Sequence, residues 1–262
     1  MAPRIATDPP LNPDYRLSGC TASDKGDRDY QQDRVVLLSH PGFSGCVLAV
    51  LADGMGGRSG GRKASDQVIL TARQLFDRYA ADHDDADELL AQIARQSHIV
   101  IRLTAISSEQ EPHSTVAAFL LNPAGDCHWM HVGDSRIYHY RDGRLVRRTS
   151  DHSYVQQLVD RGALPKEQAS RHAQSHILMA CLGSETEPPI ATHSIAAVRP
   201  GDCMLACSDG VWHYFEELEM GAVLSNLTAR EATEFLMATA RKRARGGGDN
   251  LSLVVLKIEA LP

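Results

Sequence analysis

The segment Val47-Leu48-Ala49-Val50-Leu51-Ala52-Asp53-Gly54-Met55-Gly56-Gly57 decides the fold of this chain. Six apolar residues run without a break into an acid, and three glycines follow within four positions. A short apolar run bounded by glycine is typical of a strand that is buried on both faces. It places the Asp53 carboxylate at the end of a rigid element, beside a backbone that can approach a ligand closely. The alternative is an ordinary Asp-Gly turn that closes a core strand.

The 262 residues suit one large domain, or at most two small ones. The hydrophobic fraction of 43% is enough for a substantial core. The net charge of -6 disfavours a non-specific nucleic-acid binder, because such a protein needs a basic surface. Composition therefore indicates a globular protein without a nucleic-acid partner.

The six cysteines are scattered, with no Cys-x-x-Cys pair, and several lie in apolar runs. This pattern predicts buried free thiols in a reducing compartment rather than a disulfide framework or a zinc site. Residues 1–14 contain four prolines but no hydrophobic stretch of the kind found in signal peptides, so we expect a flexible tail. No apolar run approaches the ~20 residues that span a bilayer. We therefore expect a soluble, cytoplasmic protein.

Alternating and apolar patterns predict strands at residues 15–20, 35–39, 47–52, 115–121, 127–132, 136–140, 145–148, 190–195, 204–207 and 251–258. Helical periodicity predicts helices at residues 60–81, 86–106, 216–224 and 229–243. Residues 152–182 interrupt the series of strands and are expected to form short helices. Antiparallel strands with paired long helices between them indicate an α+β layered domain, whose helices cover the outer faces of the sheets.

Three further acids repeat the pattern of Asp53. Asp134, Asp209 and Asp249 each lie at the edge of a predicted strand, beside glycine or a small polar residue. Four such acids are hard to explain as four independent turns. An all-oxygen ligand set without paired His or Cys suits Mg²⁺ or Mn²⁺ rather than zinc. The sequence therefore predicts a divalent-metal site.

Five motifs occur in order along the chain: Arg28-x-x-Gln31-Gln32-Asp33, Asp53-Gly54-Met55-Gly56-Gly57, Val132-Gly133-Asp134-Ser135-Arg136, Ser208-Asp209-Gly210 and Gly248-Asp249-Asn250-Leu251-Ser252. In this order they resemble the metal-dependent protein phosphatases (PPM, type 2C), most closely the bacterial serine/threonine branch. The resemblance extends over residues 15–258. It implies a four-layer α-β-β-α sandwich of two mainly antiparallel sheets flanked by helical pairs. Residues 15–262 would then form a single phosphatase domain, with a flap subdomain at about residues 149–182.

The resemblance also implies which residues bind metal. Asp53 would bridge two Mn²⁺ or Mg²⁺ ions, and the carbonyl of Gly54 would bind one of them. Asp209 and Asp249 would bind the other ion. Asp33 would hold metal-bound water at the edge of the site.

Two more roles follow from the resemblance. Asp134 matches the position that helps bind a third, weaker metal in bacterial members. Arg28 would clamp the substrate phosphate, since a guanidinium fork suits two phosphate oxygens. The implied reaction is hydrolysis of phosphoserine or phosphothreonine by direct attack of a metal-bridging water, without a phospho-enzyme.

The implied partners are phosphorylated proteins and a cognate Ser/Thr kinase, with no nucleic acid and no membrane, for a monomeric enzyme. The single-domain length and the Arg28-Asp29-Tyr30-Gln31-Gln32-Asp33 form of the first motif suggest regulation of a bacterial secretion system. Two alternatives remain open at this stage. One is a non-catalytic regulatory module of the same fold, and the other is a two-metal hydrolase of nucleotides or other small phosphoesters.

The flap departs from the family pattern. The run His172-Ala173-Gln174-Ser175-His176 replaces a more usual His-Pro-Arg-Arg-Asn-like run, and Cys181 lies near a position where Arg is frequent. His172 and His176 are four residues apart and could imitate a metal-binding pair, or could be exposed. These departures leave substrate selection by the flap and binding of a third metal undecided.

Histidine and tryptophan residues near the motifs allow more than one interpretation. His131 is interpreted as a hydrogen-bonded core residue, with a general acid as the alternative. His152 and His213 flank predicted site loops and could donate a proton to the leaving group. Trp129 and Trp212 are expected to be packing residues.

Overall fold

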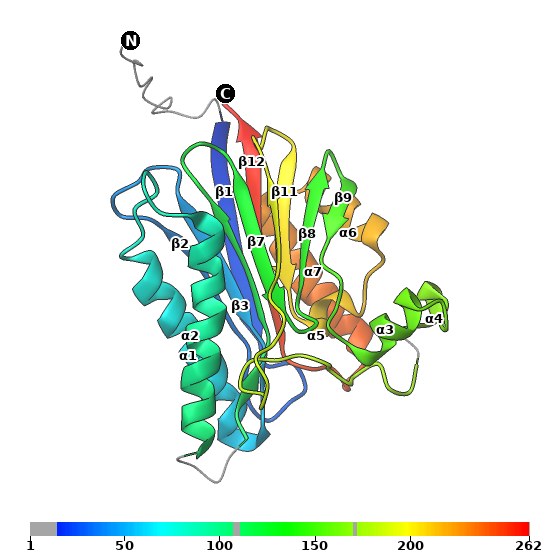
Figure 1. Ribbon diagram of the computed structural model, residues 1–262. Coiled ribbons are helices and arrows are strands. Elements are labelled where there is room, and N and C mark those ends of the chain that lie inside the picture. The colour runs from blue at the N-terminus through cyan, green and yellow to red at the C-terminus, as the bar shows by residue number, and fades with distance from the viewer. Residues whose placement is uncertain (1–14, 107–110, 170–171, 262) are drawn as a thin grey trace.

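The computed structural model describes residues 15–106, 111–169 and 172–261. Two five-stranded antiparallel sheets pack face to face (Figure 1). The first sheet has the order β1 (Tyr15–Asp24), β12 (Leu251–Ala260), β11 (Asp202–Cys207), β8 (Arg136–Arg141) and β9 (Arg144–Arg148). The second has the order β10 (Ala191–Ile195), β7 (Cys127–Val132), β6 (Val116–Leu121), β3 (Val47–Ala52) and β2 (Arg34–Ser39).

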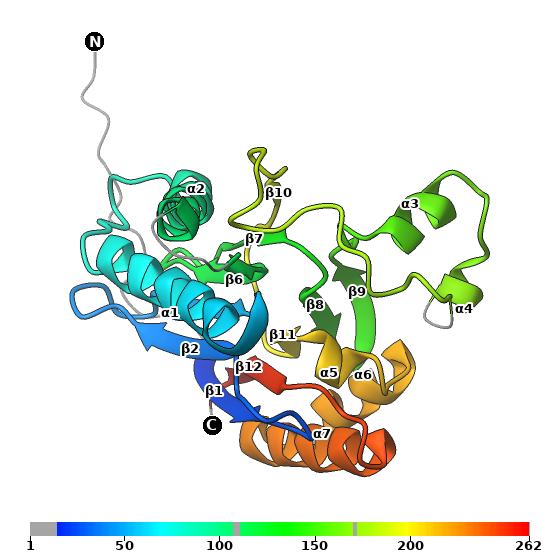
Figure 2. The ribbon, with the colours of Figure 1, turned by 90° about the horizontal axis from the view of Figure 1, so that it is seen from below.

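Helices cover the outer face of each sheet (Figure 2). The helices α1 (Gly57–Phe76) and α2 (Ala86–Ile106) pack on the second sheet, while α6 (Glu217–Asn226) and α7 (Ala229–Ala244) pack on the first. The shorter elements are α3 (Tyr154–Asp160), α4 (Lys166–Ala169), α5 (Asp209–Trp212) and the paired strands β4 (Gly54–Met55) and β5 (His113–Ser114). The predicted α-β-β-α sandwich is confirmed.

Strand β3 lies at the centre of this architecture. All six of its residues are buried. Leu48 and Val50 pack in the cluster beneath α1 and α2, while Val47 and Ala49 pack in the cluster between the two sheets. The unbroken apolar run is therefore required because both faces of the strand are covered.

The first long helix ends earlier than periodicity predicts. The sequence predicts helix over residues 60–81, but α1 ends at Phe76. The amide of Ala80 donates to the Asp84 carboxylate at 2.8 Å, and a turn replaces the last helical residues. The buried Tyr79 still packs on Phe76, with ring centroids 6.4 Å apart, so the apolar spacing continues although the helix does not.

The described residues contain no helix that is both long and apolar enough to cross a membrane. All six cysteines are free thiols, and four of them are buried, as the sequence predicts. The predicted tail at residues 1–14 lies outside the described residues.

The excursion, residues 152–182, carries α3 and α4 away from the sandwich (Figure 2), and its last residues return to the core, where Ala180 and Leu182 are buried. Ser153 caps α3 by accepting from the amide of Gln156 at 3.3 Å. The segment returns to its own start, because the amide of Met179 donates to the carbonyl of His152 at 2.8 Å. This closed excursion lies beside one end of the sheets.

A buried ion-pair network lies at the opposite end of the sheets. The Asp202 carboxylate accepts from His139 Nε2 at 2.9 Å and from Arg141 Nε and Nη2 at 2.6 and 3.0 Å. Burial alone would raise the pKa of Asp202, but these hydrogen bonds and one from the amide of Arg199 lower it well below its usual range.

We expect Asp202→Asn to lower the free energy of unfolding at neutral pH by about 2–3 kcal/mol, because a charged hydrogen-bond acceptor is lost. A depressed folded-state pKa stabilises the protein above the unfolded pKa of about 4, and this stabilisation is lost as pH falls through the folded-state pKa. The deficit of the variant should therefore shrink below about pH 4. Urea denaturation at several pH values measures this. A deficit that does not change between neutral and acid pH would contradict the assignment.

Candidate metal centre

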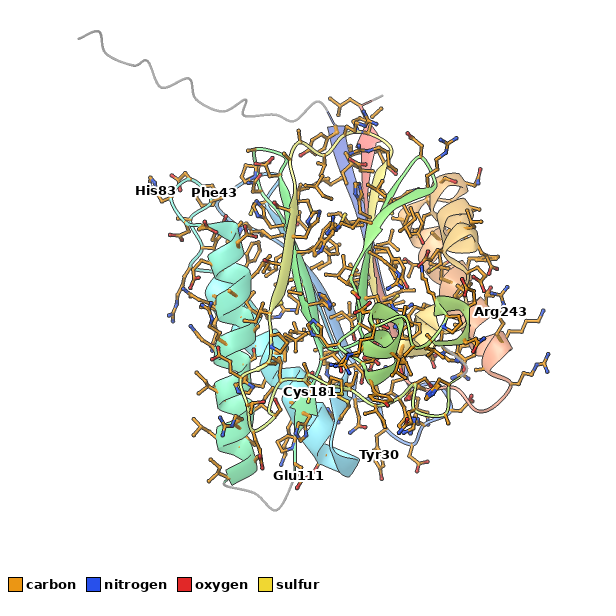
Figure 3. The ribbon with its side chains drawn as sticks, turned by 45° about the vertical axis from the view of Figure 1, so that its right-hand side comes forward. Tyr30, Phe43, His83, Glu111, Cys181 and Arg243 are labelled. Atoms are coloured by element: carbon orange, nitrogen blue, oxygen red, sulfur yellow. The ribbon has the colours of Figure 1, made fainter. Side chains whose placement is uncertain are left out.

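Five acids lie at the strand ends opposite the chain termini (Figure 1). Asp33 precedes β2 and Asp53 follows β3, both in the second sheet. Asp209 follows β11 and Asp249 precedes β12 in the first sheet, and Asp134 lies in the turn between β7 and β8. Figure 3 shows Tyr30, from the loop that carries Asp33, at this same end of the molecule. Residues distant in sequence are thus brought to one end of the sandwich.

Backbone hydrogen bonds fix the position of Asp53. Its amide donates to Thr115 Oγ1 at 3.0 Å, and its carbonyl accepts from the amide of Thr115 at 2.8 Å and from Ser114 Oγ at 3.1 Å. Burial raises the pKa of the Asp53 carboxyl well above its usual range, and the neighbouring acids, led by Asp33 and Asp209, raise it further. Thr115 had no sequence signal as a site residue.

Gly54 is confined by close backbone contacts. A Cβ atom at this position would lie 2.0 Å from the carbonyl oxygen of Gly61 and 2.8 Å from that of Gln32. Gly56, which precedes α1, has φ of 119°, a conformation that side chains rarely adopt. The glycines of this motif therefore serve close packing and a turn between β3 and α1.

Asp33 is held by Ser208. Ser208 Oγ donates to Asp33 Oδ2 at 2.8 Å and itself accepts from the amide of Ser252 at 3.0 Å. Asp33 Oδ1 is buried and has no hydrogen-bond partner among the described residues. Burial raises the pKa of Asp33 to about 7, with Asp209 and Asp249 also raising it and the Ser208 hydrogen bond opposing them.

Arg28 and Asp249 form an ion pair in which Arg28 Nη2 donates to Asp249 Oδ2 at 2.6 Å. The Arg28 side chain is 62% exposed, so a ligand in solvent can reach it. Asn250 fastens the loop that carries Arg28. Its Nδ2 donates to the carbonyls of Lys25 and Tyr30 at 2.8 and 2.9 Å. The sequence motif contains Asn250 but gave no indication of this role.

Asp134 and Asp209 face the same crowding of charge. Burial raises the pKa of Asp134 to about 8, and Asp209 and Asp151 contribute to the rise. Burial and the neighbouring Asp249 raise the pKa of Asp209 to about 6. Carboxyl groups that share a site and raise one another's pKa are the arrangement that a bound cation relieves.

The carboxylate oxygens at this end of the sheets are of the kind that bind a divalent cation, but they are not arranged as a complete coordination shell. Within residues 15–106, 111–169 and 172–261, no group of three or more His, Cys, Asp or Glu side chains is arranged as a ready-made metal cage. Asp249 is engaged with Arg28, and Asp33 with Ser208. Metal binding would exchange these partners for the ion, and the unpartnered Asp33 Oδ1 is an oxygen available for it or for bound water.

A cavity of about 730 Å³ opens beside Asp134, Asp209 and Asp249. Arg28 lines it near these acids. Val155, Val159, Lys166 and His176 from the excursion line it together with Trp212 and Phe215. The cavity therefore extends from the acids along the excursion.

The histidines divide between the core and the cavity. His131 Nε2 donates to the carbonyl of Ser150 at 2.8 Å, and burial lowers its pKa, which fits a core residue. Burial and the neighbouring His131 lower the pKa of His152 to about 4, which disfavours a protonated donor there at neutral pH. His213 lines the cavity, but burial and the neighbouring Arg136 lower its pKa as well, so the same argument disfavours a protonated donor there.

Trp212 packs against the core cluster beneath α6 and α7, as the sequence predicts, and it also makes a hydrogen bond that the sequence does not predict. Its Nε1 donates to the backbone carbonyl of Asp134 at 3.0 Å. The indole therefore connects α5, which begins at Asp209, to the turn that carries Asp134. A buried Trp N–H commonly takes a hydrogen-bond partner, but the partner could not be read from sequence.

The protein is a four-layer α-β-β-α sandwich with acids at one end of its sheets and an exposed arginine beside them. This is the architecture that the resemblance to metal-dependent phosphatases predicts. Comparison with protein families gives the narrower identification. The model of the family "Protein phosphatase 2C" matches residues 23–245. The chain belongs to the protein phosphatase 2C family.

The serine/threonine protein phosphatase PstP of Mycobacterium tuberculosis is 33% identical over 222 residues, covering 82% of this chain and 41% of PstP. The chain thus spans less than half the length of that relative. The serine/threonine phosphatase Stp of Listeria monocytogenes is 28% identical over 217 residues, covering 80% of this chain and 84% of Stp.

Among solved structures, the catalytic domain of PstP in complex with two manganese ions superimposes with a TM-score of 0.77 at 32% identity. The superposition covers 93% of this chain and 98% of that one.

Proposed function

We propose that this protein is a metal-dependent serine/threonine protein phosphatase that hydrolyses phosphoserine and phosphothreonine on proteins and opposes a Ser/Thr kinase. One observation carries the proposal: acids from both sheets meet at one end, where burial and neighbouring acids raise the pKa of Asp33, Asp53 and Asp209. The two manganese ions in the PstP catalytic domain, which has the same fold, support a divalent cation at this end.

In this proposal Asp53, the Gly54 carbonyl, Asp209 and Asp249 hold two Mn²⁺ or Mg²⁺ ions. When bound, the ions supply a hydroxide nucleophile at neutral pH and neutralise charge on the phosphate oxygens. Asp33 has one unpartnered buried oxygen and orients water at the edge of the site. Asp134 adds a weaker third cation site.

Arg28 is the proposed phosphate clamp. It is exposed, borders the cavity and reaches Asp249, so its guanidinium can exchange one anion for another. A bidentate pair with two phosphate oxygens would hold the substrate in line for attack.

The proposal extends to organisation and partners. Residues 15–262 form the phosphatase domain, and residues 149–182 form its flap. The partners are phosphoproteins and a kinase, and neither nucleic acid nor membrane is involved. We further propose a cytoplasmic monomer, in keeping with six free thiols, and a role in a secretion-system pathway. Unchanged phosphorylation of every secretion component after gene deletion would exclude that pathway.

Phosphate release from a phosphothreonine peptide tests the activity, with Mn²⁺, Mg²⁺ or EDTA, and with a nucleotide as competing substrate. We expect turnover of the peptide with metal and none with EDTA. A folded protein inactive with either ion would favour the non-catalytic module, and preference for the nucleotide would favour a small-phosphoester hydrolase.

We expect Arg28→Ala to lower kcat/KM for the phosphopeptide by about 10–100-fold, because hydrogen bonds to a charged group contribute ~1.5–3 kcal/mol. Arg28→Lys should fall between this variant and the wild type, since it keeps the charge and loses the fork. Arg16→Ala is the matched control, because Arg16 is equally exposed and pairs with Glu259 on β12. Equal losses in the Arg16 and Arg28 variants would count against the clamp.

A further inference from the structure

The turn between β7 and β8 is attached to its surroundings at each of its residues. The amide of Gly133 donates to His152 Nδ1 at 3.3 Å, and its carbonyl accepts from the amide of His152 at 2.9 Å. Ser135 Oγ and Thr115 Oγ1 share a hydrogen bond of 2.7 Å, and Thr115 is the residue that fixes Asp53. The turn that carries Asp134 is thus linked to the start of the excursion and to β3.

Arg136, at the end of this turn, is clamped on two sides. Its Nε and Nη2 donate to Asp151 Oδ1 and Oδ2 at 2.8 and 2.7 Å. Its Cζ lies 3.4 Å from the centroid of the Trp212 ring. The Arg136 and Asp151 side chains are only 16% and 7% exposed, so both contacts are shielded from water. A shielded guanidinium is attracted to the face of an indole ring, so this contact favours one position of Arg136.

Trp212, the ring on which Arg136 stacks, also links the two segments that carry Asp134 and Asp209. Trp212 donates through Nε1 to the carbonyl of Asp134 and lies in the same short helix as Asp209. Asp151 precedes the segment that contains α3 and α4. Arg136 therefore connects the two acid-bearing loops to the first residues of the excursion.

We propose that Arg136 is a positioning residue: held by Asp151 and stacked on Trp212, it fixes Asp134 and Asp209 relative to each other and so sets the affinity for divalent cations. This inference rests on the proposed function for the presence of the cations. Arg136 also balances the charge of the site, since its positive charge opposes the rise in the pKa of Asp134 and of Asp209.

Strand β8 offers a matched control at its other end. Arg141 donates Nε and Nη2 to Asp202 in the same bidentate manner as Arg136 donates to Asp151. Asp202 is the first residue of β11, whereas Asp209 follows the last residue of that strand. Arg141→Lys therefore makes the same chemical change far from the acids.

The test is calorimetric titration of Mn²⁺ into wild type, Arg136→Lys, Trp212→Phe and Arg141→Lys, with the melting temperature of each metal-free protein. We expect affinity to weaken by about 10–100-fold in Arg136→Lys and by about 10-fold in Trp212→Phe, because residues that orient metal ligands have effects of this size. Phe keeps a ring under Arg136 and loses the donor to Asp134. Arg141→Lys should lower the melting temperature without changing Mn²⁺ affinity.

The double variant Arg136→Lys/Trp212→Phe tests whether the two residues position the acids together or whether each substitution destabilises the site independently. If both residues act as one unit, its Mn²⁺ affinity should be close to that of Arg136→Lys alone, because coupled residues are not additive. Unchanged affinity in Arg136→Lys, or equal losses in Arg136→Lys and Arg141→Lys, would overturn the inference and leave the proposed function standing. A wild type that binds no Mn²⁺ would overturn both.

Discussion

Replacing Asp209 with Asn is expected to lower Mn²⁺-dependent kcat/KM on a phosphothreonine peptide by about 10²–10⁴-fold, because cation stabilisation of the transition state contributes several kcal/mol. Burial and the neighbouring Asp249 raise the pKa of Asp209, and Asp209 in turn contributes to the raised pKa of Asp53. Asn keeps the shape of the side chain and removes the charge that the cation requires. The same substitution should relieve repulsion, so the metal-free variant should melt at or above the temperature of the metal-free wild type.

Activity is expected to fall while the melting temperature of the metal-free protein stays the same or rises. This combination would exclude misfolding as the cause of the lost activity. Asp142→Asn is the matched control, since Asp142 is exposed in the turn between β8 and β9, at the other end of β8. Its φ of 50° is a conformation that Asn tolerates well. Activity of Asp209→Asn near that of wild type would contradict the role of this end of the sheets in catalysis.

Gly54→Ala is expected to destabilise the protein by about 3 kcal/mol, because the new methyl group overlaps the backbone and not a side chain that could move. The Gly61 carbonyl oxygen would lie 2.0 Å from the added atom. Any relief must shift the start of α1 or the Gly54 peptide, and the proposed site uses the carbonyl of that peptide. Mn²⁺ affinity should therefore fall together with stability.

Chemical denaturation gives the stability, and Mn²⁺ titration of the folded fraction gives the affinity. Gly42→Ala is the control, because a Cβ atom there meets only the His40 ring, at 3.6 and 3.7 Å. If the Gly54→Ala variant were as stable as wild type, α1 would have to move away freely. Close backbone packing would then no longer explain the glycine in this motif.

The sequence predicted the helical and sheet layers well, because apolar residues recur with a different period in strands than in helices. The unbroken apolar run of β3 also predicted a strand that is covered on both faces. The sequence predicted the end of α1 poorly, since Tyr79 continues the apolar spacing through a turn. Four of the five acids at strand ends could be found from their glycine neighbours, whereas Asp33 has none and was named only through the family resemblance. The partners of these acids could not be found, because Ser208 and Asp33 are 175 residues apart and meet only in the folded chain.

Arg136 illustrates the same limit. It lies in a quoted motif, yet its stacking on Trp212 depends on the approach of α5 to the β7–β8 turn. Local pattern reports which face a side chain occupies and not which ring lies above it. Roles of this kind therefore become visible only with tertiary structure.

The proposed ligands come from two different sheets: Asp53 from one, and Asp209 and Asp249 from the other. A cation held between them would join the two halves of the sandwich, and it would bind the folded chain far better than the unfolded one. Mass action then adds about 2.7 kcal/mol of stability at a free metal concentration 100 times the Kd. Removal of manganese and magnesium would therefore take away this stabilisation together with the turnover that the ions support.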